Sequence, residues 1–301
     1  MGGHPERLAL SAARACRLGA QGIDLNFGCP APTVNQHDGG AAILRYPKRI
    51  QEIVSTVRKA VPPEIPVSAK LRLGWECVED IYVNAEQAVL GGASWLTIHA
   101  RTKMQGYAPP AYWSTLGEVR RRLGSGSAAS GGSGSGSGSG PGSGVPIVAN
   151  GEIWSLEDFL RCQEETGCEH FMLGRGALGD PSLVHQIARQ LGIDCPEPLE
   201  EEEVPYSSNP RHWEPILRRF SEISEPICQD SQGSQYTSRR IKQWLRFAGM
   251  KRPLPWFDAI KRTQNLGELF AALKASGEPS GKVSGEASGA PIETVFETEK
   301  K

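Results

Sequence analysis

Apolar residues recur along the first 190 positions in two alternating patterns. Segments with apolar residues every three or four positions, the period of an amphipathic helix, lie near 5–18, 47–60, 78–90 and 111–123. Short apolar runs of strand length lie between and after them, at 22–27, 66–73, 94–99, 145–150 and 169–173. Strands that alternate with helices of this length are typical of βαβ units and predict a parallel sheet.

A further helix is indicated by the residues at its two ends. Ser155, followed three residues later by Asp158, is a variant of the capping box that begins helices. Gly167 is the residue type that most often ends them. Another helix is predicted from about residue 181, so the alternation continues to about residue 190.

Polar residues gather where each of the five predicted strands ends. They are Asn26, Cys29, Lys70, Arg72, His99, Arg101, Asn150, Glu152 and Arg175. In a βα barrel the chemistry is carried by this end of the strands. Any one of these residues could be an ordinary turn or cap residue, but five successive strand ends of this kind predict a functional site.

Composition and charge exclude several classes of protein. The 301 residues carry 33 Lys and Arg against 34 Asp and Glu, a net charge of -1. A uniformly basic nucleic-acid coat is therefore excluded, and any RNA contact must come from a local patch. No apolar run approaches the ~20 residues of a membrane-spanning helix. The seven cysteines are odd in number and irregularly spaced, which argues against a disulfide framework or a zinc site and favours a reducing, cytoplasmic location.

Three polar segments divide the chain. Residues 124–144 are almost entirely Gly and Ser and predict a flexible insertion within the first domain, 1–195. The acidic, proline-containing segment 196–210 predicts a linker, and 211–275 predicts a small helical domain. Residues 276–301 have the composition of a disordered tail.

One predicted helix of the second domain has an apolar face and a basic face. Ile241, Leu245 and Ala248, with Trp244, recur at helical spacing. On another side Arg239, Lys242 and Arg246 form a basic stripe. Such stripes are often only solvated surface, but the local excess of positive charge makes RNA a candidate partner.

Five motifs, in this order, resemble those of the tRNA-dihydrouridine synthases: DLNFGCP, SAKLRLGW, IHARTKMQGY, VPIVANGEIW and FMLGRGAL. With APTVN after the cysteine and RRIKQWL near the C-terminus, the chain is most similar to the bacterial-type C subfamily, which acts on a D-loop uridine. The resemblance runs from about residue 4 to 273 and is interrupted by the Gly/Ser segment.

The resemblance implies reduction of a tRNA uridine to dihydrouridine, with FMN as cofactor and NADPH as reductant. Hydride would pass from the flavin to C6 of the base, and Cys29 would donate the proton to C5. The implied flavin-binding residues are Lys70 and His99 at the ring, Asn150, Gly151 and Glu152 near the ribityl phosphate, and Gly174 and Arg175 at the phosphate. The implied substrate or tRNA contacts are Asn26, Arg72, Arg101, Arg239, Lys242 and Arg246. No metal is implied.

The implied fold is a (β/α)8 TIM-type barrel followed by a small C-terminal helical domain. Three further barrel strands precede the matching region in the family, so we expect this chain to form a barrel that is N-terminally truncated to about five strands. A complete barrel would be monomeric. Two alternatives remain open: an inactive RNA-binding fragment, and another FMN barrel oxidoreductase that acts on a small substrate.

Overall fold

The computed structural model describes residues 1–125, 144–194, 209–225 and 233–277. The chain divides into two compact units, the first comprising Met1–Ser208 and Arg240–Pro255, the second Asn209–Arg239 and Trp256–Lys301. This division differs from the expected boundary, which assigned all of 211–275 to one helical domain. Nearly all of the Gly/Ser insertion, the acidic linker and the expected tail lies outside the described residues.

The first unit is built on a parallel sheet whose strand order follows the order in the sequence. The predicted runs form β1 (Ile23–Asn26), β2 (Val67–Arg72), β3 (Leu96–His99), β4 (Ile147–Asn150) and β5 (His170–Met172). Each strand pairs in parallel with the next. Because all five are parallel, their carboxyl ends meet at one edge, where the polar residues of the sequence motifs lie.

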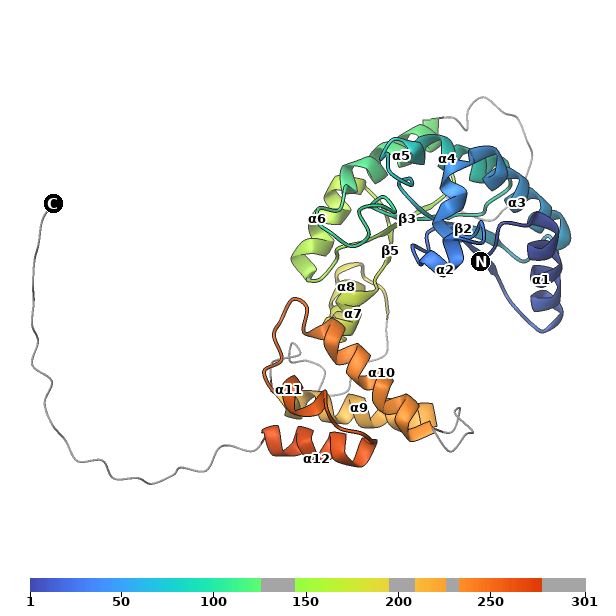
Figure 1. The fold of residues 1–301 in the computed structure, drawn as a ribbon. Helices are drawn as coiled ribbons and strands as arrows, with labels where there is room; N and C mark the ends of the chain where they lie inside the picture. The colour runs from blue at the N-terminus through green and yellow to red at the C-terminus, as the bar shows by residue number, and fades with distance from the viewer. Residues whose placement is uncertain (126–143, 195–208, 226–232, 278–301) are drawn as a thin grey trace, which may run out of the picture. The chain divides into compact units, whose positions relative to one another are not determined.

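Helices cover one face of this sheet. They are α1 (Pro5–Arg17), α3 (Pro47–Ala60), α4 (Asp80–Leu90), α5 (Trp113–Ser125) and α6 (Leu156–Thr166), all close to their predicted positions, with α8 (Ser182–Gln190) after β5. In Figure 1 the helices from α3 to α6 form an arc outside the strands. The buried core lies between these layers and includes Leu71 and Ile98 from the sheet and Ile50 and Phe159 from the helices.

The predicted ends of α6 are confirmed in detail. The hydroxyl oxygen of Ser155 accepts a hydrogen bond from the N–H of Asp158 at 3.1 Å, which satisfies a free donor of the first turn. Gly167 ends the helix with φ +61, a left-handed conformation that glycine adopts without steric cost.

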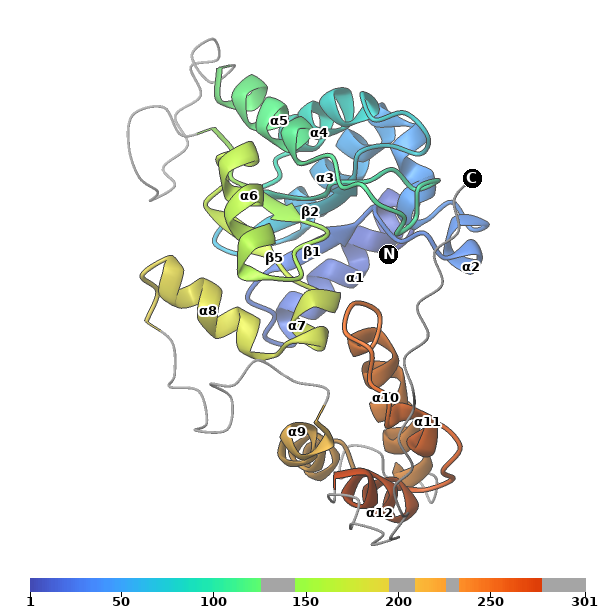
Figure 2. The ribbon, with the colours of Figure 1, turned by 90° about the vertical axis from the view of Figure 1, so that its left-hand side faces the viewer.

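Three short elements were not expected from the sequence. They are α2 (Pro32–Asn35) and the 3-10 helix η1 (Gly40–Arg45), both after β1, and α7 (Arg175–Gly179), which follows β5 directly (Figure 2). Elements of four to six residues are too short to show a hydrophobic period. All three lie in connections that follow the carboxyl ends of strands.

The C-terminal region is helical, as predicted. It contains α9 (Pro210–Ser224), α10 (Gly233–Ala248), α11 (Phe257–Ile260) and α12 (Leu266–Gly277). In the second unit α9 packs against α12, with Trp213, Leu217 and Leu269 buried. The later part of α10, from Arg240, belongs to the first unit. In the described parts of the chain, no helix is both long and apolar enough to span a membrane.

Candidate functional site

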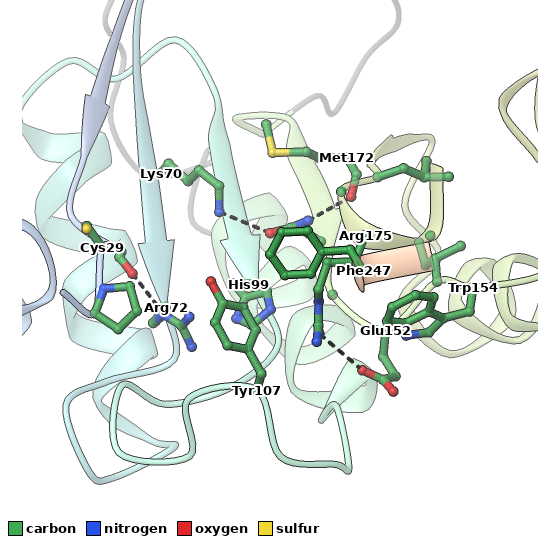
Figure 3. A pocket seen from close by; sticks show the side chains of 18 of the residues that line it. Cys29, Lys70, Arg72, His99, Tyr107, Glu152, Trp154, Met172, Arg175 and Phe247 are labelled. Carbon is green, nitrogen blue, oxygen red and sulfur yellow. Dashed lines mark hydrogen bonds and ion pairs between the residues drawn. The ribbon is translucent and has the colours of Figure 1, made fainter. Parts of the chain in front are cut away.

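The carboxyl ends of the strands enclose a cavity of about 540 Å³ (Figure 3). Pairing aligns Asn26 with Lys70, Arg72 with His99, and His99 with Asn150. The volume is typical of sites for small molecules and cofactors. The residues expected for catalysis and cofactor binding all line it: Cys29, Lys70, His99, Asn150, Gly151, Glu152, Gly174 and Arg175.

Cys29 is held at the cavity wall by the loop that follows β1. The side-chain oxygen of Asn26 accepts hydrogen bonds from the N–H groups of Gly28 and Cys29, at 3.0 and 3.1 Å. The carbonyl of Cys29 accepts one from the amide of Asn35 at 2.8 Å. Gly40, with φ +57, crosses so close that a Cβ there would lie 2.8 Å from that carbonyl. Both the polar partners and the glycine therefore fix the backbone that carries the thiol.

Arg72 joins this loop to the loop that follows β3. Its Nε donates to the carbonyl of Gly28 at 2.8 Å, and its Nη1 donates to the carbonyls of Thr102 and Gly106 at 3.0 and 2.8 Å. The residue is only 3% exposed. The expected contact of Arg72 with RNA or substrate is thus accompanied by a structural role, because most of its donors are occupied by backbone.

Lys70 projects into the cavity from β2. Its ammonium donates to the side-chain oxygen of Asn150 at 3.0 Å, and the amide of Asn150 donates to the carbonyl of Met172 at 2.7 Å. Burial lowers the pKa of Lys70 to about 8, helped by the positive charge of Arg72 and opposed by Asp24. The ammonium is therefore charged at neutral pH and loses its proton as the pH rises through about 8.

His99 is a neutral imidazole among cations. Burial, followed by the charges of Arg72 and Lys70, lowers its pKa to about 2. Its Nδ1 is buried without a hydrogen-bond partner in the described structure. Gly151, with φ +115, passes so close that a Cβ there would lie 3.0 Å from the imidazole ring. This backbone approach explains why glycine follows Asn150.

Glu152 holds three cations together at the other side of the cavity. Its carboxylate accepts from Arg101 Nη2 at 2.5 Å and lies 3.3 Å from Lys251 Nζ and 3.7 Å from Arg175 Nη2. Burial alone would raise the pKa of Glu152, but the hydrogen bonds and charges of Arg101 and Lys251 outweigh it and lower the pKa. Arg101 is fully buried and one of its nitrogens, Nη1, has no partner in the described residues.

Arg175 begins α7, directly after Gly174. Its guanidinium lies over the rings of Tyr107 and Trp154, with the central carbon 4.5 and 5.1 Å from the ring centroids. A Cβ at Gly174 would meet no atom within 4 Å, so the backbone there faces open space. The cavity thus offers an arginine beside accessible backbone, a combination suited to an anionic group.

The two faces predicted for α10 are observed. Ile241, Leu245 and Ala248 are buried, whereas Arg239 and Arg246 are exposed and Lys242 is half-buried. None of these three basic residues lines the cavity.

Several lining residues were missed by sequence reasoning. Tyr107 and Trp154 lie inside the quoted motifs, a few residues after the ends of β3 and β4, so their positions in the sequence were an available signal. Phe247 and Met250 come from the end of α10 and the turn after it. No local pattern in the sequence links that segment to the strand ends.

The comparisons with known proteins agree with the motifs. The profile of the family described as "Dihydrouridine synthase (Dus)" matches residues 1–131 and 141–271. A tRNA-dihydrouridine(16) synthase of Aquipseudomonas alcaligenes is 38% identical over 267 residues, which cover 88% of this chain and 74% of that protein. The protein of the same name from Pseudomonas syringae pv. tomato is 40% identical over 249 residues, covering 81% and 67%.

The neutral state of His99 predicts a pH dependence of stability. Between its ordinary pKa of 6.5 and about 2, the unfolded imidazole binds a proton that the folded one does not. Stability from this source is thus lost as the pH falls below 6.5, by about 1.4 kcal/mol per pH unit. Urea unfolding at pH 7.5, 6.5 and 5.5 should show wild type losing stability relative to His99→Gln. A difference that does not change with pH would contradict the assignment.

Proposed function

Because the chain belongs to the dihydrouridine synthase family, we propose that it reduces a D-loop uridine of tRNA to dihydrouridine. The observation that carries the proposal is that the thiol of Cys29, the ammonium of Lys70 and the guanidinium of Arg175 line one cavity, together with the carboxylate of Glu152. The names of the relatives, which specify tRNA and the number 16, support the same substrate here.

The cavity fits a flavin mononucleotide. Positive charge comes from Lys70, Arg72 and Arg175 in the lining, and from Arg101 and Lys251, which pair with the carboxylate of Glu152. The orphaned Nδ1 of His99 and the open backbone at Gly174 leave polar groups available to a ligand. When bound, FMN would supply the hydride for C6 of the base, with NADPH as the source of electrons. Gly174 and Arg175 would hold the phosphate, and Asn150, Gly151 and Glu152 would lie near it.

The thiol of Cys29 would donate the proton to C5 of the uracil. A half-buried thiol can serve as a general acid, provided that its position is fixed. Asn26 and Asn35 provide this through three hydrogen bonds to the cysteine loop. In the proposed step the proton moves from Sγ to C5, and solvent supplies a new proton to Sγ after turnover.

The charges of the remaining residues suit this chemistry. The ammonium of Lys70 would stabilise negative charge on the reduced ring system. A neutral imidazole at His99 can offer one donor and one acceptor, which a charged one cannot. Tyr107 is 55% exposed at the cavity and offers a ring on which a pyrimidine could stack.

We further propose that the sheet is part of a (β/α)8 barrel. Its strands follow one another in sequence order and its helices lie outside them, as in barrels and unlike doubly wound sheets. The basic stripe of Arg239, Lys242 and Arg246 would contact tRNA phosphates, which position the substrate without reading its sequence.

Replacement of Cys29 tests the proposed activity. With FMN, NADPH and unmodified tRNA, the wild-type chain should form dihydrouridine, detected by mass spectrometry of the digested tRNA. Cys29→Ala should lower the rate by about 10²–10⁴-fold, the usual contribution of a general acid. The exposed Cys77 provides a matched control, and Cys77→Ala should retain the wild-type rate. Equal rates for Cys29→Ala and wild type would refute the role of the thiol, and no product from wild type would refute the activity.

Titration of Lys70 should weaken binding of the reduced flavin. The ammonium is charged below a pKa of about 8 and neutral above it, so the affinity for reduced FMN should fall as the pH rises through 8. Anaerobic binding titrations in the Cys29→Ala background exclude any contribution from that thiol. Lys70→Arg, which stays charged in this range, should lack the alkaline decrease. The same decrease in both proteins would assign it to another group.

A further inference from the structure

The turn that follows α10 reaches the cavity. Trp244 Nε1 donates to the carbonyl of Leu178 at 2.7 Å, which fixes α10 against α7. Three residues further along the helix, Phe247 contributes to the cavity wall, and Met250 follows it there. Lys251 comes next and extends its ammonium to Glu152 Oε1 at 3.3 Å. The helix that carries the basic residues Lys242 and Arg246 therefore also forms part of the cofactor cavity.

The positive charges around Glu152 outnumber its single negative charge. Arg101, Arg175 and Lys251 bring three positive charges to one carboxylate, which leaves a net charge of +2. A phosphate monoester carries a charge between -1.5 and -2 at pH 7. Lys251 is needed for this balance, because without it the set would carry only +1. The cluster is thus complementary to the phosphate of a nucleotide, but only when the turn after α10 is in place.

Lys251 also determines how available Arg175 is. The two oxygens of Glu152 have different partners. Oε2 lies 2.5 Å from Arg101 and 3.7 Å from Arg175, whereas Oε1 pairs with Lys251. Removal of the ammonium would leave Oε1 without a counter-ion. Arg175 lines the cavity and lies 3.7 Å from Oε2, so the more negative carboxylate would attract its guanidinium more strongly and leave it less available to an anionic ligand.

We propose that Lys251 couples binding of the cofactor to binding of tRNA: it completes the cation set for the flavin phosphate, and the phosphate in turn holds α10 in the position that binds tRNA. This inference rests on the proposed function. Coupling free energies are reciprocal, so FMN should raise the affinity for tRNA by the same factor as tRNA raises that for FMN. Lys251 acts here as a positioning residue, since its observed contacts are with Glu152 and the ring of Trp154.

The turn after α10 has a second contact with the rest of the first unit, so that replacing Lys251 alone should not detach it. The neighbouring Arg252 lies 3.4 Å from Asp180, a buried carboxylate that also accepts hydrogen bonds from Ser182. Lys251 itself is 55% exposed in its side chain. Lys251→Ala should therefore fold, with α10 still attached through Trp244 and Arg252.

The experiment compares tRNA affinity in the presence of FMN, of riboflavin and of neither. Riboflavin has the same ring system without the phosphate. The wild-type chain should bind unmodified tRNA on the order of tenfold more tightly with FMN than with riboflavin. Lys251→Ala should abolish this difference and should also lower the ratio of FMN to riboflavin affinity. Lys59→Ala is the matched control, because Lys59 is an exposed lysine at the end of α3 that leads into β2, opposite the cavity.

The outcomes separate this inference from the proposed function. If wild type binds FMN and tRNA without coupling, or if Lys251→Ala keeps the wild-type difference, the coupling is refuted and the proposed activity is unaffected. If wild type binds neither FMN nor tRNA, both are refuted. Loss of the difference in Lys59→Ala as well would show that it reflects general charge and would also overturn the role of Lys251.

Discussion

Parallel pairing of the five strands is the constraint on which the site depends. Each strand is only three to six residues long, yet the pairing brings Asn26, Lys70, His99 and Asn150 side by side. A slip of one residue in any pair would turn these side chains into the helix layer, where the apolar core lies. The same burial that stabilises the sheet therefore fixes which polar groups face the cavity.

Burial of several cations at one edge gives the site its electrostatic character. Lys70 keeps its proton at neutral pH while His99 loses it, because their pKa values are lowered to about 8 and about 2. One carboxylate, Glu152, lies among the cations and offsets part of their mutual repulsion. Such an arrangement favours an anionic ligand, and the phosphate of the proposed flavin would supply the balancing negative charge.

Much of this could be predicted from the sequence where the signal is local. Regular helices show a hydrophobic period, and Ser155 and Gly167 mark the ends of α6 through their own backbone chemistry. The cavity residues were predictable because motifs place them at strand ends. The apolar face and the basic face of α10 were predictable because its apolar residues recur at helical spacing, as in the other helices.

The remainder depends on contacts between distant segments. Nothing near Arg72 in the sequence shows that its guanidinium binds the carbonyls of Gly28, Thr102 and Gly106. Likewise Lys251 is ninety-nine positions from Glu152 and belongs to none of the quoted motifs. The short helices α2 and α7 could not be predicted for another reason: with four and five residues they contain little more than one turn, so no hydrophobic repeat is visible.

The most direct test of the account is the rate at which iodoacetamide alkylates Cys29, measured by mass spectrometry with and without FMN. Cys77 is exposed and outside the cavity lining, and it serves as an internal reference in the same chain. We expect FMN to slow alkylation of Cys29 and to leave that of Cys77 unchanged. Equal rates at Cys29 with saturating FMN would contradict the claim that the thiol faces the flavin.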